Sequence, residues 1–266
     1  MVNFENSFGF TVNGVSIRSK HAVQSQNIFR HVVRRAENIG MKVNTDKTAM
    51  ICISDSLSYD ADAFILDKDG QRIGCQEQIK ALGMVFGRRP NMDLQVEHMA
   101  KKMRQRFWTL RNLKKNGFTN EELVRVYTTV IRPVLDYGSV VYHSSLTDEQ
   151  DELLDRQQNQ ALKCIYGPGI SGRRMREMAG LTTLRQRRID QCDKFAAKCL
   201  ASDRFSDWFP TKKTRRSARK AGKCEEYVEK KARCNRLYNS PLFYLRRRLN
   251  GKEGKSYGLR NAEYRV

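Results

Sequence analysis

The sequence predicts an α+β chain in which one helix and a few short strands fill the first 90 residues and helices fill the rest. Hydrophobic residues recur at helical spacing between Ala22 and Ile39. Short apolar runs separated by turn-forming residues follow as far as Phe86, which is typical of strands. Beyond Pro90 only the helical period remains, and several helix starts carry capping residues. We therefore expect a small sheet with one helix, then a helical bundle and a basic helical tail.

The first expected elements are a strand or loop, a helix and a second strand. Residues 1–20 contain short apolar runs interrupted by glycines. In the helix that follows, the apolar residues share one face (Ile28, Phe29, Val32, Val33 and Ala36). Gly40 stands just beyond the helix end, where a left-handed conformation is common. A strand over Met41–Asn44 is expected directly after it.

Three further short strands are expected before residue 90. The apolar runs Ala49–Ile53, Ala63–Leu66 and Ile79–Phe86 have the length and composition of strands. The segment Asp67–Gly70 has the composition of a hairpin turn. These runs are too short for separate domains, so we expect them to form one small sheet region with the helix.

Several helices beyond Pro90 have recognisable N-terminal capping residues. The first, Asp93–Leu113, places Met99, Met103, Phe107 and Leu110 on one face. The second and third begin at Thr–x–x–Glu/Gln capping boxes, Thr119 with Glu122 and Thr147 with Gln150. Pro133 should end or kink the second helix near Arg132. A further capping pair, Thr183 with Gln186, starts a helix in which Cys192 and Cys199 are expected to be buried.

The charge balance indicates a polyanionic partner. The chain has 50 Lys and Arg against 29 Asp and Glu, which gives a net charge of +21. Residues 171–266 alone contain 27 basic and 10 acidic residues. The last third is therefore expected to supply most of the attraction to phosphate.

The cysteine and histidine content favours a metal-free chain in a reducing compartment. Seven cysteines form no CxxC pair, which favours free thiols in the nucleus or cytoplasm. Structural zinc is disfavoured, because all four histidines precede residue 144. No apolar run approaches the length of a signal peptide or a membrane helix, so no membrane partner is expected.

A basic ridge follows the first helix beyond Pro90. Lys101, Arg104, Arg111 and Lys115 recur opposite the apolar stripe, and Lys102 and Arg106 stand beside them. Such a ridge can follow a nucleic-acid backbone without reading its sequence. A solvated charged face is the alternative, because most amphipathic helices have one.

Two basic segments lie in the tail. Residues 212–223, which include Arg215 and Arg216, have no apolar period and are interpreted as a flexible linker. Such a run serves as a nuclear-import or nucleic-acid-binding patch, or is simply solvated. Arg246, Arg247 and Arg248 follow two aromatic residues, a mixture that suits stacking on single-stranded bases and contact with phosphates.

Several segments in one order resemble a known family. They read GMKVNTDKT, IKALGMVFG, VYTTVIRPVLDYGSVVYHSSLT and LDRQQNQALKCIYG, and they extend from about His21 to Gly169. Together they resemble the end of the palm and the thumb of reverse transcriptases from non-LTR (LINE-class, jockey-like) retrotransposons. The resemblance divides the chain into an unmatched segment (residues 1–20), a partial palm (21–90), a thumb-like helical domain (91–169), a helical extension (170–211) and a basic linker and tail (212–266).

The resemblance implies roles for three residues. Lys47 matches the motif D lysine, which can act as a general acid toward departing pyrophosphate in an intact polymerase. Leu82 and Gly83 match the primer grip, a hairpin whose backbone approaches the primer. The alternatives are a solvated lysine and an ordinary hairpin glycine.

The resemblance also implies an absence. A palm holds Mg²⁺ with paired aspartates on a strand-turn-strand before motif D, yet the acids before Asn44 are only Glu5 and Glu37. We expect a chain that binds RNA, DNA or an RNA–DNA hybrid but does not extend a primer alone, and whose partner could be an upstream polymerase half. A stand-alone nucleic-acid-binding protein derived from a retroelement is the alternative, and a relic that does not fold stably is a third possibility.

Overall fold

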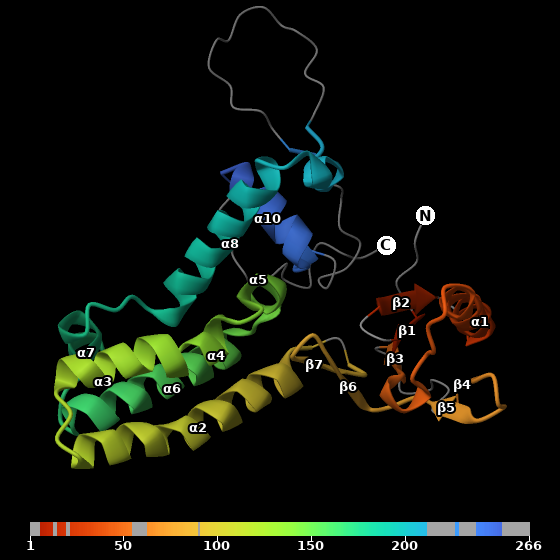
Figure 1. Cartoon of the computed structure of the whole chain (residues 1–266). Helices are drawn as coiled ribbons and strands as arrows, with labels where there is room; N and C mark the ends of the chain where they lie inside the picture. The colour runs from red at the N-terminus through yellow and green to blue at the C-terminus, as the bar shows by residue number, and fades with distance from the viewer. Residues whose placement is uncertain are drawn as a thin grey trace, which may run out of the picture. The chain divides into compact units, whose positions relative to one another are not determined.

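The chain has a mixed α+β structure that divides into two compact units, Met1–Gln95 and Val96–Val266 (Figure 1). The computed structural model describes residues 6–12, 15–19, 22–54, 63–89, 91–211, 227–228 and 238–251. Strands occur in the first unit, and helices make up most of the described second unit, which agrees with the α+β class expected from the sequence.

The first unit contains a three-stranded antiparallel sheet in the order β2–β1–β3. Strands β1 (Asn6–Val12) and β2 (Val15–Ser19) pair antiparallel ahead of the first helix. Strand β3 (Ala49–Ser54) pairs with the other edge of β1. The first 20 residues, for which the sequence left strand and loop open, therefore supply two strands to this sheet.

Helix α1 (Ala22–Asn38) ends as its sequence predicts. Gly40 has φ +75°, its N–H donates to the Glu37 carbonyl, and the Met41 N–H donates to the Ala36 carbonyl. The buried face of α1 packs with β3, β4 and β5 around Phe29, Met50 and Ile65. The helix thus covers a small core made from strands that follow it in the sequence.

The strand expected over Met41–Asn44 is absent, because these residues form an extended connection instead. Asn44 explains the difference. Its side chain accepts a hydrogen bond of 3.1 Å from the Lys47 N–H and caps the 3₁₀ turn η1 (Thr45–Lys47). A residue whose side chain caps a turn competes with strand pairing at the same position.

Two hairpins complete the first unit. Strands β4 (Phe64–Leu66) and β5 (Arg72–Gly74) flank the predicted turn, where the Asp67 N–H donates to the Gln71 carbonyl. The run Ile79–Phe86, expected as one strand, is a hairpin of β6 (Gln78–Ala81) and β7 (Met84–Gly87). Two consecutive residues with positive φ between them reverse the chain.

Long helices build the second unit. Helix α2 (Asp93–Lys115) begins at the end of the first unit and buries its predicted apolar stripe. Both predicted capping boxes form, at the starts of α3 (Asn120–Val126) and α6 (Asp148–Tyr166). The other described helical elements are α4 (Pro133–Asp136), α5 (Ser139–Tyr142), η3 (His143–Ser145), α7 (Gly172–Met178), α8 (Leu184–Leu200), η4 (Asp203–Trp208) and α10 (Pro241–Leu249).

Pro133 interrupts the second predicted helix, as expected. A π-helical segment, η2 (Tyr127–Ile131), follows α3 directly, and a new short helix starts at the proline. Arg106 of α2 donates a hydrogen bond of 2.6 Å to the Val130 carbonyl in this segment. Arg106 therefore supplies a hydrogen bond to the backbone where the α-helical pattern gives way to the π-helical one.

Two arginines of helix α8 form ion pairs with aspartates of α4 and α6. Arg188, only 1% exposed, pairs with Asp151 of α6. Arg187 donates two hydrogen bonds of 2.7 and 2.9 Å to one oxygen of Asp136 in α4. Beyond the pairs, α10 packs on α8 around the buried residues Cys192, Ala196, Cys199, Phe209, Tyr244 and Leu245. The tail helix α10 therefore belongs to the core of the second unit, and the predicted burial of both α8 cysteines is confirmed.

Candidate nucleic-acid interface

One face of α2 is basic and open. Lys101, Arg104, Arg111 and Lys115 are exposed, while Met99, Met103, Phe107 and Leu110 on the other side are at most 3% exposed. The buried stripe fixes the rotation of the helix, so these four cations point away from the core. We call Lys101, Arg104, Arg111 and Lys115 the α2 basic face.

The cations of the α2 basic face have no internal partner in the described part of the chain. None of the four makes a hydrogen bond or ion pair there, and α2 has no Asp or Glu after Glu97. Of the two neighbouring basic residues in the prediction, Lys102 is half-buried and Arg106 is bonded to Val130. The open surface therefore consists of the four, and Arg106 supports the helix.

Sequence reasoning overlooked Trp108, which stands in the middle of the α2 basic face. Its side chain is 66% exposed, an unusual state for tryptophan. It lies four residues after Arg104 and three before Arg111, so all three share one side of the helix. The signal was present in the sequence, since Trp108 is also seven residues from both Lys101 and Lys115.

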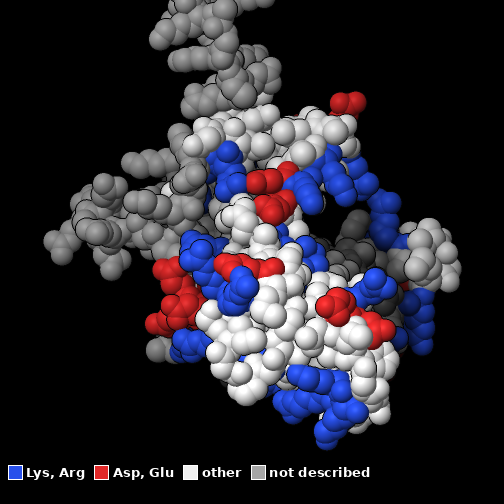
Figure 2. All heavy atoms as spheres, turned by 90° about the vertical axis from the view of Figure 1, so that its left-hand side faces the viewer, with Lys and Arg blue, Asp and Glu red and all other residues white. Residues whose placement is uncertain are grey.

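The surface of the second unit shows how differently its cations are placed. Figure 2 shows Asp and Glu side chains beside some of the Lys and Arg side chains of the visible face, and a group of Lys and Arg at its lower edge without them. On α7, for example, Arg173 and Arg174 both contact Glu177, at 3.1 and 3.4 Å. Compensated cations of this kind attract phosphate less than the uncompensated cations of α2.

Leu82 and Gly83 form the two-residue turn of the β6–β7 hairpin. Their φ angles are +48° and +79°, which defines a turn of type I′. Leu82 is 79% exposed, and a leucine with positive φ is strained. The hairpin is held by Gln95, whose side-chain oxygen accepts a hydrogen bond of 2.8 Å from the Val85 N–H. The first unit thus presents an exposed, tightly turned tip at the two residues that the resemblance singles out.

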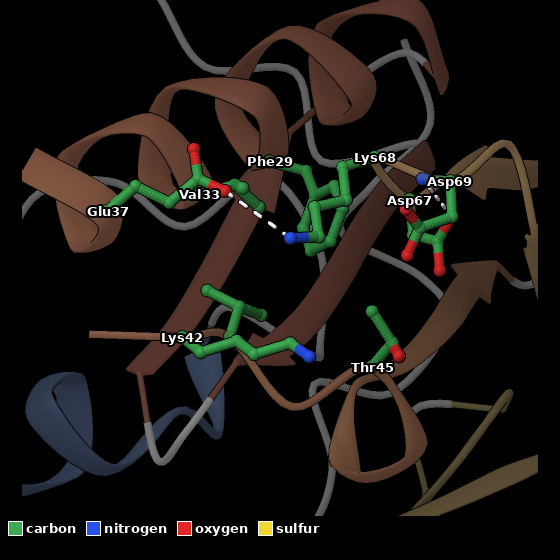
Figure 3. A pocket seen from close by; sticks show the side chains of 9 residues that line it. Phe29, Val33, Glu37, Lys42, Thr45, Asp67, Lys68 and Asp69 are labelled. Carbon is green, nitrogen blue, oxygen red and sulfur yellow. Dashed lines mark hydrogen bonds and ion pairs between the residues drawn. The ribbon is translucent and has the colours of Figure 1, made fainter. Parts of the chain in front are cut away.

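Lys47 is exposed at the end of the η1 turn. A small pocket of about 80 Å³ lies next to this turn, but Lys42, not Lys47, lines it (Figure 3). Lys68 and Glu37 form an ion pair of 3.7 Å within the lining, and Asp67 is committed to its own turn through hydrogen bonds from the Asp69 and Gln71 N–H groups. The lining therefore carries three acidic and two basic side chains and offers no excess of positive charge for a phosphate.

The arginines of α10 are committed to internal contacts. Arg246 and Arg247 are 7% and 5% exposed, and donate to the carbonyls of Trp208 (2.8 Å) and Tyr238 (2.6 Å). Arg248 makes two hydrogen bonds of 2.6 Å with the carboxylate of Asp193. Arg246 and Arg247 are thus buried, whereas Arg248 is half-buried and paired with Asp193. Arg215 and Arg216 lie outside the described residues.

Neither a metal site nor a membrane helix is found where the structure describes the chain. In those residues no three His, Cys, Asp or Glu side chains gather in a way that could hold a metal ion. No helix among them has the length and apolarity that crossing a bilayer requires. Comparison with protein-family models, curated proteins and solved structures found no match to this chain.

Proposed function

We propose that this chain binds nucleic acid through the α2 basic face and derives from the palm end and thumb of a non-LTR retrotransposon reverse transcriptase. One observation carries the binding proposal: four exposed cations, which have no partner among the described residues, lie along one side of a helix whose other side is buried. From Lys101 to Lys115 the helix rises about 21 Å, so the face can contact several phosphates of one backbone. Binding of this kind is independent of sequence.

Chain order in the first unit supports the proposed descent. The family requires two paired strands before motif D, and β1 and β2 pair antiparallel immediately before α1. Between these strands the sequence has Asn13 and Gly14, neither of which is acidic. The β6–β7 hairpin then follows in the order expected for a primer grip.

The residues present do not fit the Mg²⁺ of an intact polymerase. Two-metal phosphoryl transfer requires clustered carboxylates, and the sequence contains no adjacent pair of aspartates. We therefore propose binding without polymerisation for this chain. RNA–DNA hybrid, RNA and DNA are the proposed partners, because each offers a phosphate backbone.

The salt dependence of hybrid binding tests this proposal. The variant K101Q/R104Q/R111Q/K115Q should bind a fluorescein-labelled RNA–DNA hybrid more weakly than the wild-type chain. In a plot of log K against log salt its slope should be smaller by roughly 3, since each phosphate contact contributes about 0.7–0.9. Fluorescence anisotropy over a series of NaCl concentrations measures both quantities.

The control is R215A/R216A, which removes charge from the basic linker. A linker that only adds net charge should change the slope less than the α2 variant does. The proposal fails if the quadruple variant keeps the wild-type slope, or if the linker pair costs as much affinity per charge removed. Far-UV circular dichroism confirms that all variants are folded.

A further inference from the structure

We propose that Trp108 is a stacking platform for an unpaired nucleotide base, so that the α2 basic face prefers single-stranded nucleic acid or a frayed strand end over a continuous duplex. The inference rests on the binding function proposed above and specifies its ligand. It changes the expected partner, because a purely electrostatic ridge does not distinguish strands that carry equal charge.

The geometry places the indole where a base would meet it. Trp108 is 66% exposed and has Arg104 one turn before it and Arg111 one turn after it on the same side of α2. Lys101 and Lys115 continue the row two turns away in each direction. A backbone held by these cations would carry its bases past the only aromatic side chain on this face.

The surroundings of Trp108 argue against a packing role. The apolar stripe of α2 that includes Met103 and Phe107 lies on the other side of the helix, and both residues are nearly inaccessible. The second tryptophan of the chain, Trp208, has internal contacts. The centroids of its ring and that of Phe205 are 4.9 Å apart, and its carbonyl accepts a hydrogen bond from Arg246. Arg104 and Arg111, on either side of Trp108, can attract phosphates. The exposed indole between them offers its face to a base.

Stacking requires a base whose face is free. In a continuous duplex both faces of each base are covered by neighbouring base pairs, whereas a single strand can present one. Alanine substitution of stacking aromatics in single-strand-binding proteins weakens binding by about 1–3 kcal/mol per base, or roughly five- to hundredfold in affinity. The same substitution should have little effect on a ligand that has phosphates but no bases.

The experiment uses the full chain with Trp208→Phe, which leaves Trp108 as its single tryptophan. Its fluorescence is titrated with single-stranded dT12, with an abasic 12-mer of equal charge, and with a 12-base-pair duplex. We expect quenching by dT12 and little quenching by the abasic strand. Trp108→Ala should weaken dT12 binding about five- to hundredfold and leave abasic binding within twofold, and Trp108→Phe should recover part of the loss.

A matched control is Tyr137→Ala, which removes a 57% exposed aromatic ring elsewhere in the second unit. It should leave dT12 binding unchanged. Equal binding of dT12 by the wild-type and Trp108→Ala chains, or equal quenching by dT12 and the abasic strand, would overturn the stacking proposal while the phosphate-binding function stands. If the wild-type chain binds none of the three ligands at low salt, the proposed function fails and the stacking proposal fails with it.

Discussion

The basic residues of α2 and those of α8 and α10 look alike in the sequence but differ in the structure in exposure and pairing. On α2, Lys101, Arg104, Arg111 and Lys115 are exposed and have no partner among the described residues. On α8 and α10, Arg187, Arg188 and Arg248 each hold an aspartate from another helix. An arginine that already pairs with a carboxylate inside the fold is less available to a ligand. We infer that this difference determines which basic segment binds phosphate.

The comparison changes the charge map drawn from composition. Residues 171–266 hold most of the net charge, and they were expected to supply most of the attraction to phosphate. In the described part of that segment, however, many arginines are paired or buried, including Arg246 and Arg247. A paired cation produces little net field at the surface. Among the described residues, the proposed binding face therefore lies on α2 and not on α8 or α10.

The largest expected effect is on stability, from breaking a buried pair. Arg188→Met leaves Asp151 buried without its main partner, and the loss of one member of a buried pair costs about 3–5 kcal/mol of unfolding free energy. Urea denaturation measures the change. The matched variant on α2, Lys101→Met, should stay within about 0.5 kcal/mol of wild type.

A second substitution separates the pair from its packing. In Asp151→Leu with Arg188→Met both charges are removed, so the double variant should recover most of the stability lost by the single one. If Arg188→Met alone costs no more than Lys101→Met, the distinction between structural and available cations is wrong.

The next effect is a pH dependence that arises in the same interior. Burial, with Arg188 and Arg185 contributing, lowers the pKa of His143 to about 3. The unfolded chain binds this proton near pH 6.5, and the folded chain does not, so acid favours unfolding. Between pH 7 and pH 5 the unfolding free energy should fall by about 2 kcal/mol from this residue alone.

The comparison with His143→Gln isolates that contribution. Glutamine can keep a hydrogen bond to the Tyr244 hydroxyl, which lies 3.2 Å from His143 Nε2, but it does not titrate. Urea denaturation at pH 7, 6 and 5 should therefore show a smaller loss of stability for the variant. Parallel pH curves for the two chains would mean that His143 is accessible to protons in the folded state.

Local signals allowed much of the fold to be predicted from the sequence. The capping boxes at Thr119 and Thr147 and the left-handed Gly40 depend on residues within a few positions, and all three form. The apolar stripe of α2 is likewise set by its own period. The strand predicted at Met41–Asn44 was wrong, because the Asn44 side chain caps the following turn. That signal is also local, but it favours a turn and not a strand.

The candidate site was less predictable, because pairing depends on distant residues. Asp193 and Arg248 are 55 positions apart, and no spacing rule brings them together. The sequence alone therefore does not reveal that Arg248 pairs with Asp193. Trp108 is the reverse case, since its helical spacing from Arg104 and Arg111 could have revealed its place in the basic face before the structure did.

The most direct test of the central claim compares two double variants that remove the same charge. R104A/R111A takes two unpaired cations from α2, and R173A/R174A takes two cations that contact Glu177 from α7. Both should leave the melting temperature nearly unchanged, because all four side chains are exposed. For binding to an RNA–DNA hybrid, R104A/R111A should reduce the log K against log salt slope by about 1.4–1.8, and R173A/R174A by clearly less. Equal slopes for the two variants would contradict the account and leave only nonspecific attraction by net charge.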